Sequence, residues 1–294
     1  MKPKFPFHQV DVFCSDKETA YLGNQVAVIT IPGGHVVSDA DMQKFACWAN
    51  LSETTFLLPP THPDADYQLR IFTKSRELPF AGHPTLGSCH AWLESGGQPK
   101  SNDVIVQQCA KGLIKIRRNC REGTLAFEAP PLNRSGPLSP SDLDAVVKAL
   151  RLNASDVVAH SWCANGPSWM GLLLPSADRV LSIRPDYGQL GHMDVGVIGP
   201  IGKDDDDDGF DFEVREFMSL DDGGEDPVCG SLNASLAQWL IGSGRAPASG
   251  YVARQGTVLG RKGRVSASVD ASSASSSAVL WIGGMCITCI KGDI

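Results

Sequence analysis

Alternating hydrophobic and polar residues dominate this chain, and helical periodicity is confined to a few segments. A period of two is typical of strands with one buried face. In the first half it predicts strands at residues 10–13, 24–29, 51–58, 67–73, 104–106, 113–116 and 124–128. In the second half it predicts strands at residues 169–174, 195–199, 212–217, 251–256, 264–269 and 278–282. We therefore expect a mostly antiparallel sheet in each half.

Two segments with a period near 3.6 interrupt this pattern and predict helices. Ser38 precedes the first, with Asp41 three residues later, and Ser139 precedes the second, with Pro140 and Asp142 in its first turn. A serine cap followed by an acidic residue satisfies backbone donors and suits the positive end of the helix dipole. Together, these helices and the strands indicate an α+β fold.

One motif occurs twice, about half a chain apart. The segment HPTLGS at residues 83–88 aligns with DPVCGS at residues 226–231, so that His83 matches Asp226. Each copy follows a predicted strand and precedes an apolar segment that ends in Trp-Leu. We interpret each copy as a strand, a Pro/Gly turn and a helix that opens at the Gly-Ser pair. Such an internal repeat predicts two related halves.

The two helix starts have a possible function in common. A helix start presents unsatisfied N–H groups and the positive end of the dipole, which suits a carboxylate or a phosphate. Two such starts facing each other would make one anion-binding cleft. For a single copy, a simple N-cap after a turn is the better explanation. The repetition, with the titratable residues His83 and Asp226 at one offset, favours the binding role.

Length and composition set the class of protein. The 294 residues suffice for two domains, which we place at 1–129 and 130–294, with a linker at 130–137 and a last strand that can cross back to the first half. The formal net charge of −7 disfavours nucleic-acid and anionic-membrane partners. No apolar run approaches the ~20 residues of a membrane helix. Nine scattered cysteines and a start without an apolar signal sequence predict a reduced, cytoplasmic protein.

Several standard signatures of catalysis and cofactor binding are missing from the sequence. The glycines around His83 resemble those of a P-loop but lack its lysine, and no Rossmann fingerprint, G-x-S-x-G or H-E-x-x-H motif occurs. The histidines are too dispersed for a recognisable metal site. Cys286 and Cys289 form a lone C-x-x-C within a predicted strand, where the two side chains would point to opposite faces. We therefore expect no metal and no cofactor.

Three residues are candidates for acid/base chemistry. Glu53 lies in an otherwise apolar strand, where burial would raise the carboxyl pKa and allow proton exchange near neutral pH. Each candidate also has a purely structural explanation. Glu53 could be an exposed residue at a strand edge, His83 a core or turn histidine, and Asp226 the side chain of an Asx-turn.

Several blocks of the sequence resemble the phenazine-biosynthesis-like (PhzF) family, in the family's order and across nearly the whole chain. The blocks are Val10-Asp11-Val12-Phe13 with Gly23-Asn24, Ser52-Glu53-Thr54-Thr55-Phe56, residues 77–87, Glu225-Asp226-Pro227 with Gly230-Ser231, and Arg254-Gln255-Gly256. The resemblance implies a diaminopimelate-epimerase-like fold. That fold has two pseudo-symmetric α+β halves, each a barrel-like sheet around a central helix, with the active site between them.

The resemblance also implies roles for individual residues. Glu53 would be the general acid/base, and His83 and Asp226 would be polar partners on opposite sides of the cleft. The substrate carboxylate would be held by residues at the helix starts and beside Glu53: Gly82, Gly230, Ser231 and Ser52. The implied reaction is a cofactor-free proton shift, as in the isomerisation of trans-2,3-dihydro-3-hydroxyanthranilate. The implied assembly is a homodimer.

The cysteines mark one departure from related proteins. Epimerases of this fold use two cysteines, one from each half, as opposed bases. Here Cys89 follows its Gly-Ser pair, whereas Cys229 precedes its own and stands where the family block usually has Thr. This disfavours a two-thiol racemase. Two alternatives to the isomerase stay open: an amino-acid epimerase acting through His83, Asp226 or Glu53, and a non-catalytic protein that binds small carboxylates.

Overall fold

The structure is a computed structural model, and it describes residues 4–16, 18, 20–202, 208–270 and 278–294. The chain divides into two compact units. The first consists of residues 1–128 and 283–294, and the second of residues 129–282. Among the described residues, no helix is long and apolar enough to cross a membrane.

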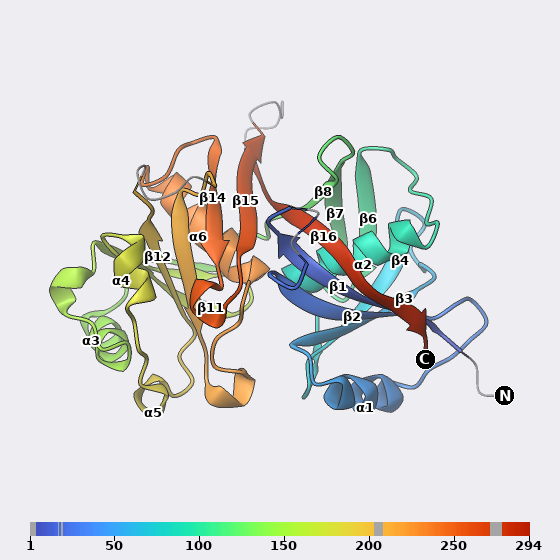
Figure 1. The fold of residues 1–294 in the computed structure, drawn as a ribbon, viewed down its shortest axis with the longest axis horizontal. Helices are drawn as coiled ribbons and strands as arrows, with labels where there is room; N and C mark the ends of the chain where they lie inside the picture. The colour runs from blue at the N-terminus through green and yellow to red at the C-terminus, as the bar shows by residue number, and fades with distance from the viewer. Residues whose placement is uncertain (1–3, 17, 19, 203–207, 271–277) are drawn as a thin grey trace. The chain divides into compact units, whose positions relative to one another are not determined.

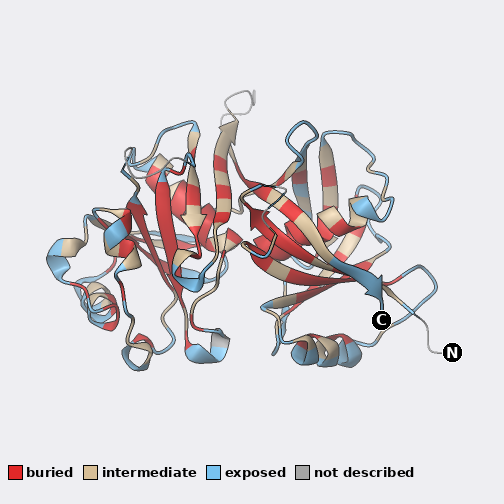
Figure 2. Ribbon diagram, viewed as in Figure 1, coloured by how far each residue is buried: buried red, intermediate tan, exposed pale blue. Residues whose placement is uncertain are grey.

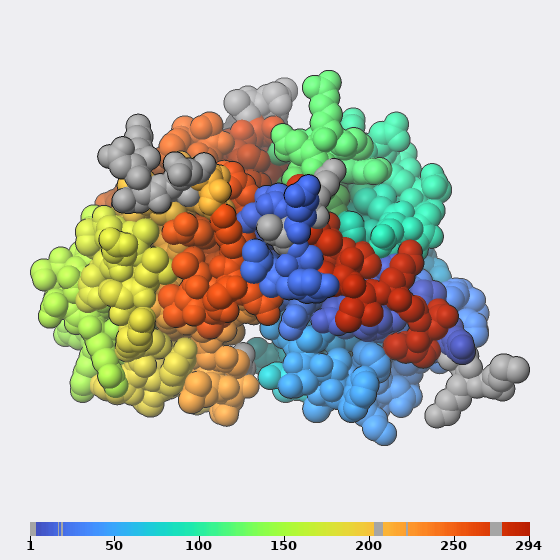
Figure 3. Space-filling view, in the orientation of Figure 1, coloured from blue at the N-terminus to red at the C-terminus, as the bar shows by residue number. Residues whose placement is uncertain are grey.

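The first unit is a closed β-barrel. Its strands are β1 (Pro6–Cys14), β2 (Asn24–Thr30), β3 (Glu53–Leu58), β4 (Tyr67–Phe72), β6 (Val104–Cys109), β7 (Gly112–Asn119), β8 (Thr124–Glu128) and the end of β16 (Val279–Asp293). They pair in the order β1-β2-β3-β4-β6-β7-β8-β16, and β16 also pairs with β1, which closes the ring. The end of β16 lies beside β1 at the surface (Figures 1 and 3). The short β5 (Glu77–Leu78) pairs with β4.

The structure describes two helices in this unit. Helix α1 (Asp39–Ala49) begins after Ser38, whose side chain accepts a hydrogen bond from the N–H of Asp41, as the sequence predicts. Helix α2 (Gly82–Glu94) is the central helix of the barrel, contacts β1, β2, β3, β4 and β8, and is buried along most of its length (Figure 2).

The second unit repeats this architecture with additional helices. Its strands are β9 (Arg134–Gly136), β10 (Ala159–Ala164), β11 (Ser168–Leu173), β12 (Val195–Pro200), β13 (Phe212–Phe217), β14 (Gly250–Gln255) and β15 (Gly263–Asp270), paired in that order. Its helices are α3 (Pro140–Ala149), α4 (Ala177–Leu181), α5 (Tyr187–Leu190) and the central α6 (Gly230–Gly242). Short 3₁₀ turns occupy Ala154–Asp156, Leu220–Asp222 and Thr257–Leu259. Ser139 caps α3 as predicted.

The internal repeat is visible in the strand pairing. In the first unit the successive pairs from β1 to β7 are antiparallel, parallel, antiparallel, parallel and antiparallel. The pairs from β10 to β15 follow the same series. Each central helix has 13 residues and follows the fourth strand of its series. The expected α+β fold with two pseudo-symmetric halves is therefore confirmed.

The alignment of the two motifs, however, is wrong in detail. Helix α2 begins at Gly82, so that Gly87-Ser88 lies in the middle of the helix and not at its start. The corresponding start of α6 is Gly230. This register matches His83 with Ser231, and Asp226 lies four residues before α6. Pro84 is compatible with the early start, because the N–H that proline lacks has no helical partner in the first turn.

The close packing around Gly87 explains why a glycine lies inside the helix. A Cβ atom at this position would lie 2.4 Å from Val26 Cγ1 and 2.9 Å from Val12 Cγ2. The helix can thus approach β1 and β2 only where the side chain is absent.

Other local expectations also need correction. The predicted linker at 130–137 contains β9, which pairs with β10. A strand forms here because the edge of β10 offers hydrogen-bond partners to the backbone groups of this segment. The alternation pattern missed β10 itself, and the short helices α4 and α5 were not anticipated.

We predict that Gly87→Ala lowers the free energy of unfolding by about 1–3 kcal/mol, because the added methyl group overpacks the contact with Val12 and Val26. Urea denaturation of the purified protein measures this. Gly242→Ala at the end of α6 is the matched control, since its added Cβ meets no atom within 4 Å. The control should be neutral or slightly stabilising. Equal stability of the two variants would contradict the packing argument.

Candidate functional site

Glu53 and His83 lie together in the first unit. Glu53 opens β3, and His83 is the second residue of α2. The Nε2 atom of His83 lies 3.4 Å from Oε2 of Glu53, and their side chains are 4% and 16% exposed. The carboxyl group is thus partly shielded from water and keeps a route to it.

His83 is held neutral by its surroundings. Burial lowers its pKa to about 3, and a hydrogen bond with the backbone of Gln25 opposes this only in part. Its Nδ1 atom lies 3.4 Å from the side-chain nitrogen of Asn24. At neutral pH the histidine therefore presents an uncharged ring to Glu53.

A buried polar contact fixes the strand that carries Glu53 against the helix that carries His83. The hydroxyl groups of Thr55 and Ser88 lie 2.8 Å apart, and Thr55 also donates to the carbonyl of Ala27. Ser88, interpreted from the sequence as part of a helix start, instead joins α2 to β3. Of the other expected residues, Ser52 is exposed beside Glu53, and Gly82 is buried at the start of α2.

The second unit brings together Asp226, Gly230 and Ser231 around the start of α6. Cys229 is the N-cap, and its sulfur accepts a hydrogen bond from the N–H of Leu232 and lies 3.3 Å from the hydroxyl of Ser231. Cysteine here takes the capping role that serine or threonine usually has. The sequence repeat placed Cys89 and Cys229 at different offsets, and the helix register agrees, because the N-cap of α2 is Ala81.

Gln255 holds the turn before α6 in place. Its side-chain oxygen accepts hydrogen bonds from the N–H of Cys229 and from the amide of Asn233, and its nitrogen donates to the carbonyl of Asp226. The residue lies in the Arg254-Gln255-Gly256 block noted in the sequence, but no pattern indicated this role.

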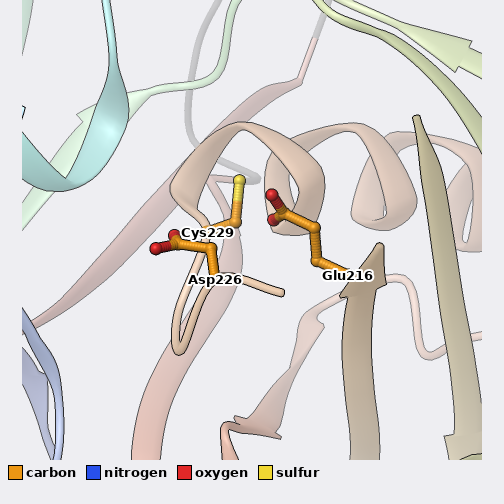
Figure 4. Close-up of side chains that lie close together, drawn as sticks. All are labelled: Glu216, Asp226 and Cys229. Carbon is orange, nitrogen blue, oxygen red and sulfur yellow. The ribbon is translucent and has the colours of Figure 1, made fainter. Parts of the chain in front are cut away.

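Glu216 is a site residue that the sequence did not reveal. It lies on β13 and is 1% exposed, and one ligand atom from each of Glu216, Asp226 and Cys229 lies within 4.8 Å of the others (Figure 4). Burial raises the pKa of the Cys229 thiol well above its ordinary value, and the negative charges of Glu216 and Asp226 raise it further. The equivalent strand position in the first unit is Ile71, so this acidic surrounding is specific to the second.

The structure thus gathers the expected residues into two groups. Glu53, Ser52, Gly82 and His83 form the first, and Asp226, Gly230 and Ser231 form the second. The first group has the chemistry of a proton carrier, because its carboxyl group is partly buried next to a neutral imidazole. The second has backbone donors at a helix start and a thiol that stays protonated at neutral pH.

We predict that the ring of His83 does not titrate between about pH 8 and pH 5. Its pKa of about 3 lies below the ordinary 6.5 of the unfolded chain. As the pH falls, the unfolded state therefore binds the proton before the folded state does. The stability that the neutral ring contributes is therefore lost as the pH falls from about 6.5 toward 3. NMR titration of the histidine ring signals, assigned with His83→Gln, checks this. A titration of His83 near pH 6.5 would contradict it.

A second prediction concerns Cys229. Iodoacetamide should label the exposed Cys47 and Cys120 well before Cys229, and Glu216→Gln should accelerate labelling of Cys229. Removing the negative charge lowers the thiol pKa. Each pH unit by which this pKa falls raises the thiolate fraction about tenfold. Peptide mass spectrometry measures the rates. Asp178→Asn, an exposed acid on α4, is the control, and equal rates in the two variants would refute the assigned role of Glu216.

Comparison with known proteins identifies the family. Residues 10–292 match the family model of the phenazine biosynthesis-like proteins, PhzC-PhzF. The chain is 36% identical over 299 residues to antisense-enhancing sequence 1 of Schizosaccharomyces pombe, with 97% of each covered. It is 32% identical over 173 residues to the trans-2,3-dihydro-3-hydroxyanthranilate isomerase of Pseudomonas fluorescens, covering 58% of this chain and 59% of that one. A PhzF-family crystal structure from Bacillus anthracis superposes with a TM-score of 0.82 at 17% identity, with 99% of each chain covered. The chain therefore belongs to the phenazine biosynthesis-like (PhzF) family and is an isomerase.

Proposed function

We propose that this isomerase shifts a proton on a small carboxylate-bearing molecule of the dihydro-hydroxyanthranilate type, with Glu53 as general acid and base. The observation that carries the proposal is the contact between the partly buried Glu53 carboxyl group and the neutral ring of His83. A base that is shielded from bulk water, with an uncharged neighbour, keeps its affinity for a proton.

The proposed reaction needs one proton and no change in oxidation state. The Glu53 carboxylate removes a proton from a substrate carbon, and the electron pair of the broken C–H bond is delocalised over the adjacent π-system. The carboxylic acid so formed returns the proton to another carbon on the same face. Glu53 ends the cycle as it began, so the step is balanced without a cofactor.

His83 would orient the Glu53 carboxyl group during this cycle. A cationic histidine at 3.4 Å would lower the carboxyl pKa and weaken the base, whereas a neutral ring does not. Its own burial and the nearby Asn24 fix the ring in one position. We propose that Asp226 is a polar partner of the substrate.

The carboxylate of the substrate would be bound at the helix starts. In the first unit we assign this role to the N–H group of Gly82 with the Ser52 hydroxyl, and in the second unit to the N–H groups of Gly230 and Ser231 with the Ser231 hydroxyl. Oriented backbone donors at a helix start are well suited to an anion. The named substrate of the Pseudomonas fluorescens relative supports an anthranilate-like carboxylate. We further propose that the protein acts in the cytoplasm as a homodimer.

The test is deuterium exchange. Because the partly exposed Glu53 carboxylic acid can exchange its proton with solvent before returning it, wild type incubated with trans-2,3-dihydro-3-hydroxyanthranilate in heavy water should give isomerised, deuterated product. Glu53→Gln should lower the rate at least about 100-fold, because general acid–base catalysis contributes at least this factor. Product formation and deuterium content are followed by mass spectrometry.

Glu122→Gln, in the exposed turn between β7 and β8, is the matched control and should keep the wild-type rate. Comparable exchange by Glu53→Gln and wild type would exclude Glu53 as the base. Loss of stereochemical purity in incubated amino acids, without isomerisation, would instead support the epimerase alternative. Tight carboxylate binding with no exchange in wild type would support a binding protein.

A further inference from the structure

A second cluster of polar side chains lies at the opposite end of α2 from Glu53. His90 and Glu94 are four residues apart near the end of the helix, and residues at this spacing share one helix face. His8 on β1 and Thr288 on β16 complete the cluster. The distance along the helix from His83 to Glu94 is about 17 Å at a rise of 1.5 Å per residue. The cluster is therefore separate from the candidate site.

His8 is the unusual member of this cluster. Its side chain is 1% exposed, and neither ring nitrogen has a hydrogen-bond partner among the residues that the structure describes. Its Nε2 atom lies 3.8 Å from Oε2 of Glu94, too far for a hydrogen bond. Buried polar atoms without a partner are rare, and an ion or a water molecule is the usual explanation.

The separation of the His8 and Glu94 ligand atoms suits a metal ion. Two ligand atoms about 2.1 Å from one zinc ion lie at most about 4.2 Å apart, so the His8–Glu94 separation of 3.8 Å is compatible with a shared ion. The Thr288 hydroxyl donates to the same Glu94 oxygen at 2.7 Å and lies 3.2 Å from Nε2 of His90. Two imidazoles and a carboxylate are a ligand set for divalent transition metals.

The electrostatics of the helix end also favour a cation. The C-terminal end of α2 carries the negative end of the helix dipole, and its last turn has no lysine or arginine. Glu94 adds a formal negative charge and is 40% exposed, which leaves access from solvent. One cationic group opposes binding. Lys291 lies directly opposite His8 in the β1–β16 ladder.

We propose that His8, His90 and Glu94 form a binding site for a divalent transition-metal ion such as zinc. The two histidines are far apart in the sequence, and only the barrel brings them together. Convergence on one ion requires the His90 and Glu94 side chains to rotate toward His8, away from their contacts with Thr288. The site would join β1 to the central helix next to β16, and its role would be structural.

The test uses the full-length protein after treatment with a chelator. Isothermal titration calorimetry with zinc should show one bound equivalent, and cobalt should give the visible spectrum of a coordinated ion. Glu94→Gln and His90→Asn should each weaken zinc binding at least about tenfold, since even outer-shell partners contribute that much. Lys291→Met should tighten it, because a like charge is removed.

His62→Gln is the matched control, since His62 and Asp64 form an exposed histidine–carboxylate pair on another loop. It should leave zinc affinity unchanged. Circular dichroism verifies that each variant folds. His8→Asn should also weaken zinc binding, and if this buried substitution prevents folding, Glu94→Gln at the partly exposed Glu94 still tests the site. Absence of saturable zinc binding in wild type, equal affinity of all variants, or a loss in His62→Gln that matches the others would overturn the proposal.

Discussion

The fit of the central helix inside the barrel is the constraint on which the first unit depends. Helix α2 is enclosed by strands, so each residue on its surface must match a neighbour in size or in hydrogen bonding. Gly87 meets this demand by having no side chain next to Val12 and Val26. Ser88 meets it by sharing its hydroxyl group with Thr55. Because Thr55 lies two residues after Glu53 on β3, the same fit determines where the Glu53 carboxyl group lies relative to His83.

The two units show what one architecture allows at equivalent positions. The first has Ile71 on its fourth strand and Ala81 before its central helix, and both are inert. The second has Glu216 and Cys229 there, with the carboxyl group buried close to the thiol. Removing a carboxylate from water costs free energy, and only the second unit has a carboxylate, that of Glu216, at this position. The repeat therefore preserves the backbone while the chemistry of the two helix starts differs.

Local patterns predicted much of the fold and less of the site. The caps at Ser38 and Ser139 were predictable, because a serine cap depends on residues within one turn. The start of α2 was not, because the Gly-Ser pair is a good local start signal and only the packing against β1 and β2 places it inside the helix. Glu216 escaped notice because all six residues of β13 are buried. In such a strand, alternating polar and apolar residues do not distinguish a buried face from an exposed one, so nothing in the sequence marked Glu216 as buried. The cluster around His8 depends on barrel closure, which no local pattern contains.

The path of β16 has a consequence for how the molecule folds. Its first residues belong to the second unit, and residues 283–294 complete the barrel of the first by pairing with β1 and β8. During synthesis the first unit would therefore have two unpaired strand edges until the whole second unit has been made. Such edges are templates for wrong pairing between chains, and contacts this distant in sequence form slowly. A chain cut before residue 283 would be an open sheet around α2, and the order of synthesis makes the N-terminal unit the last to close.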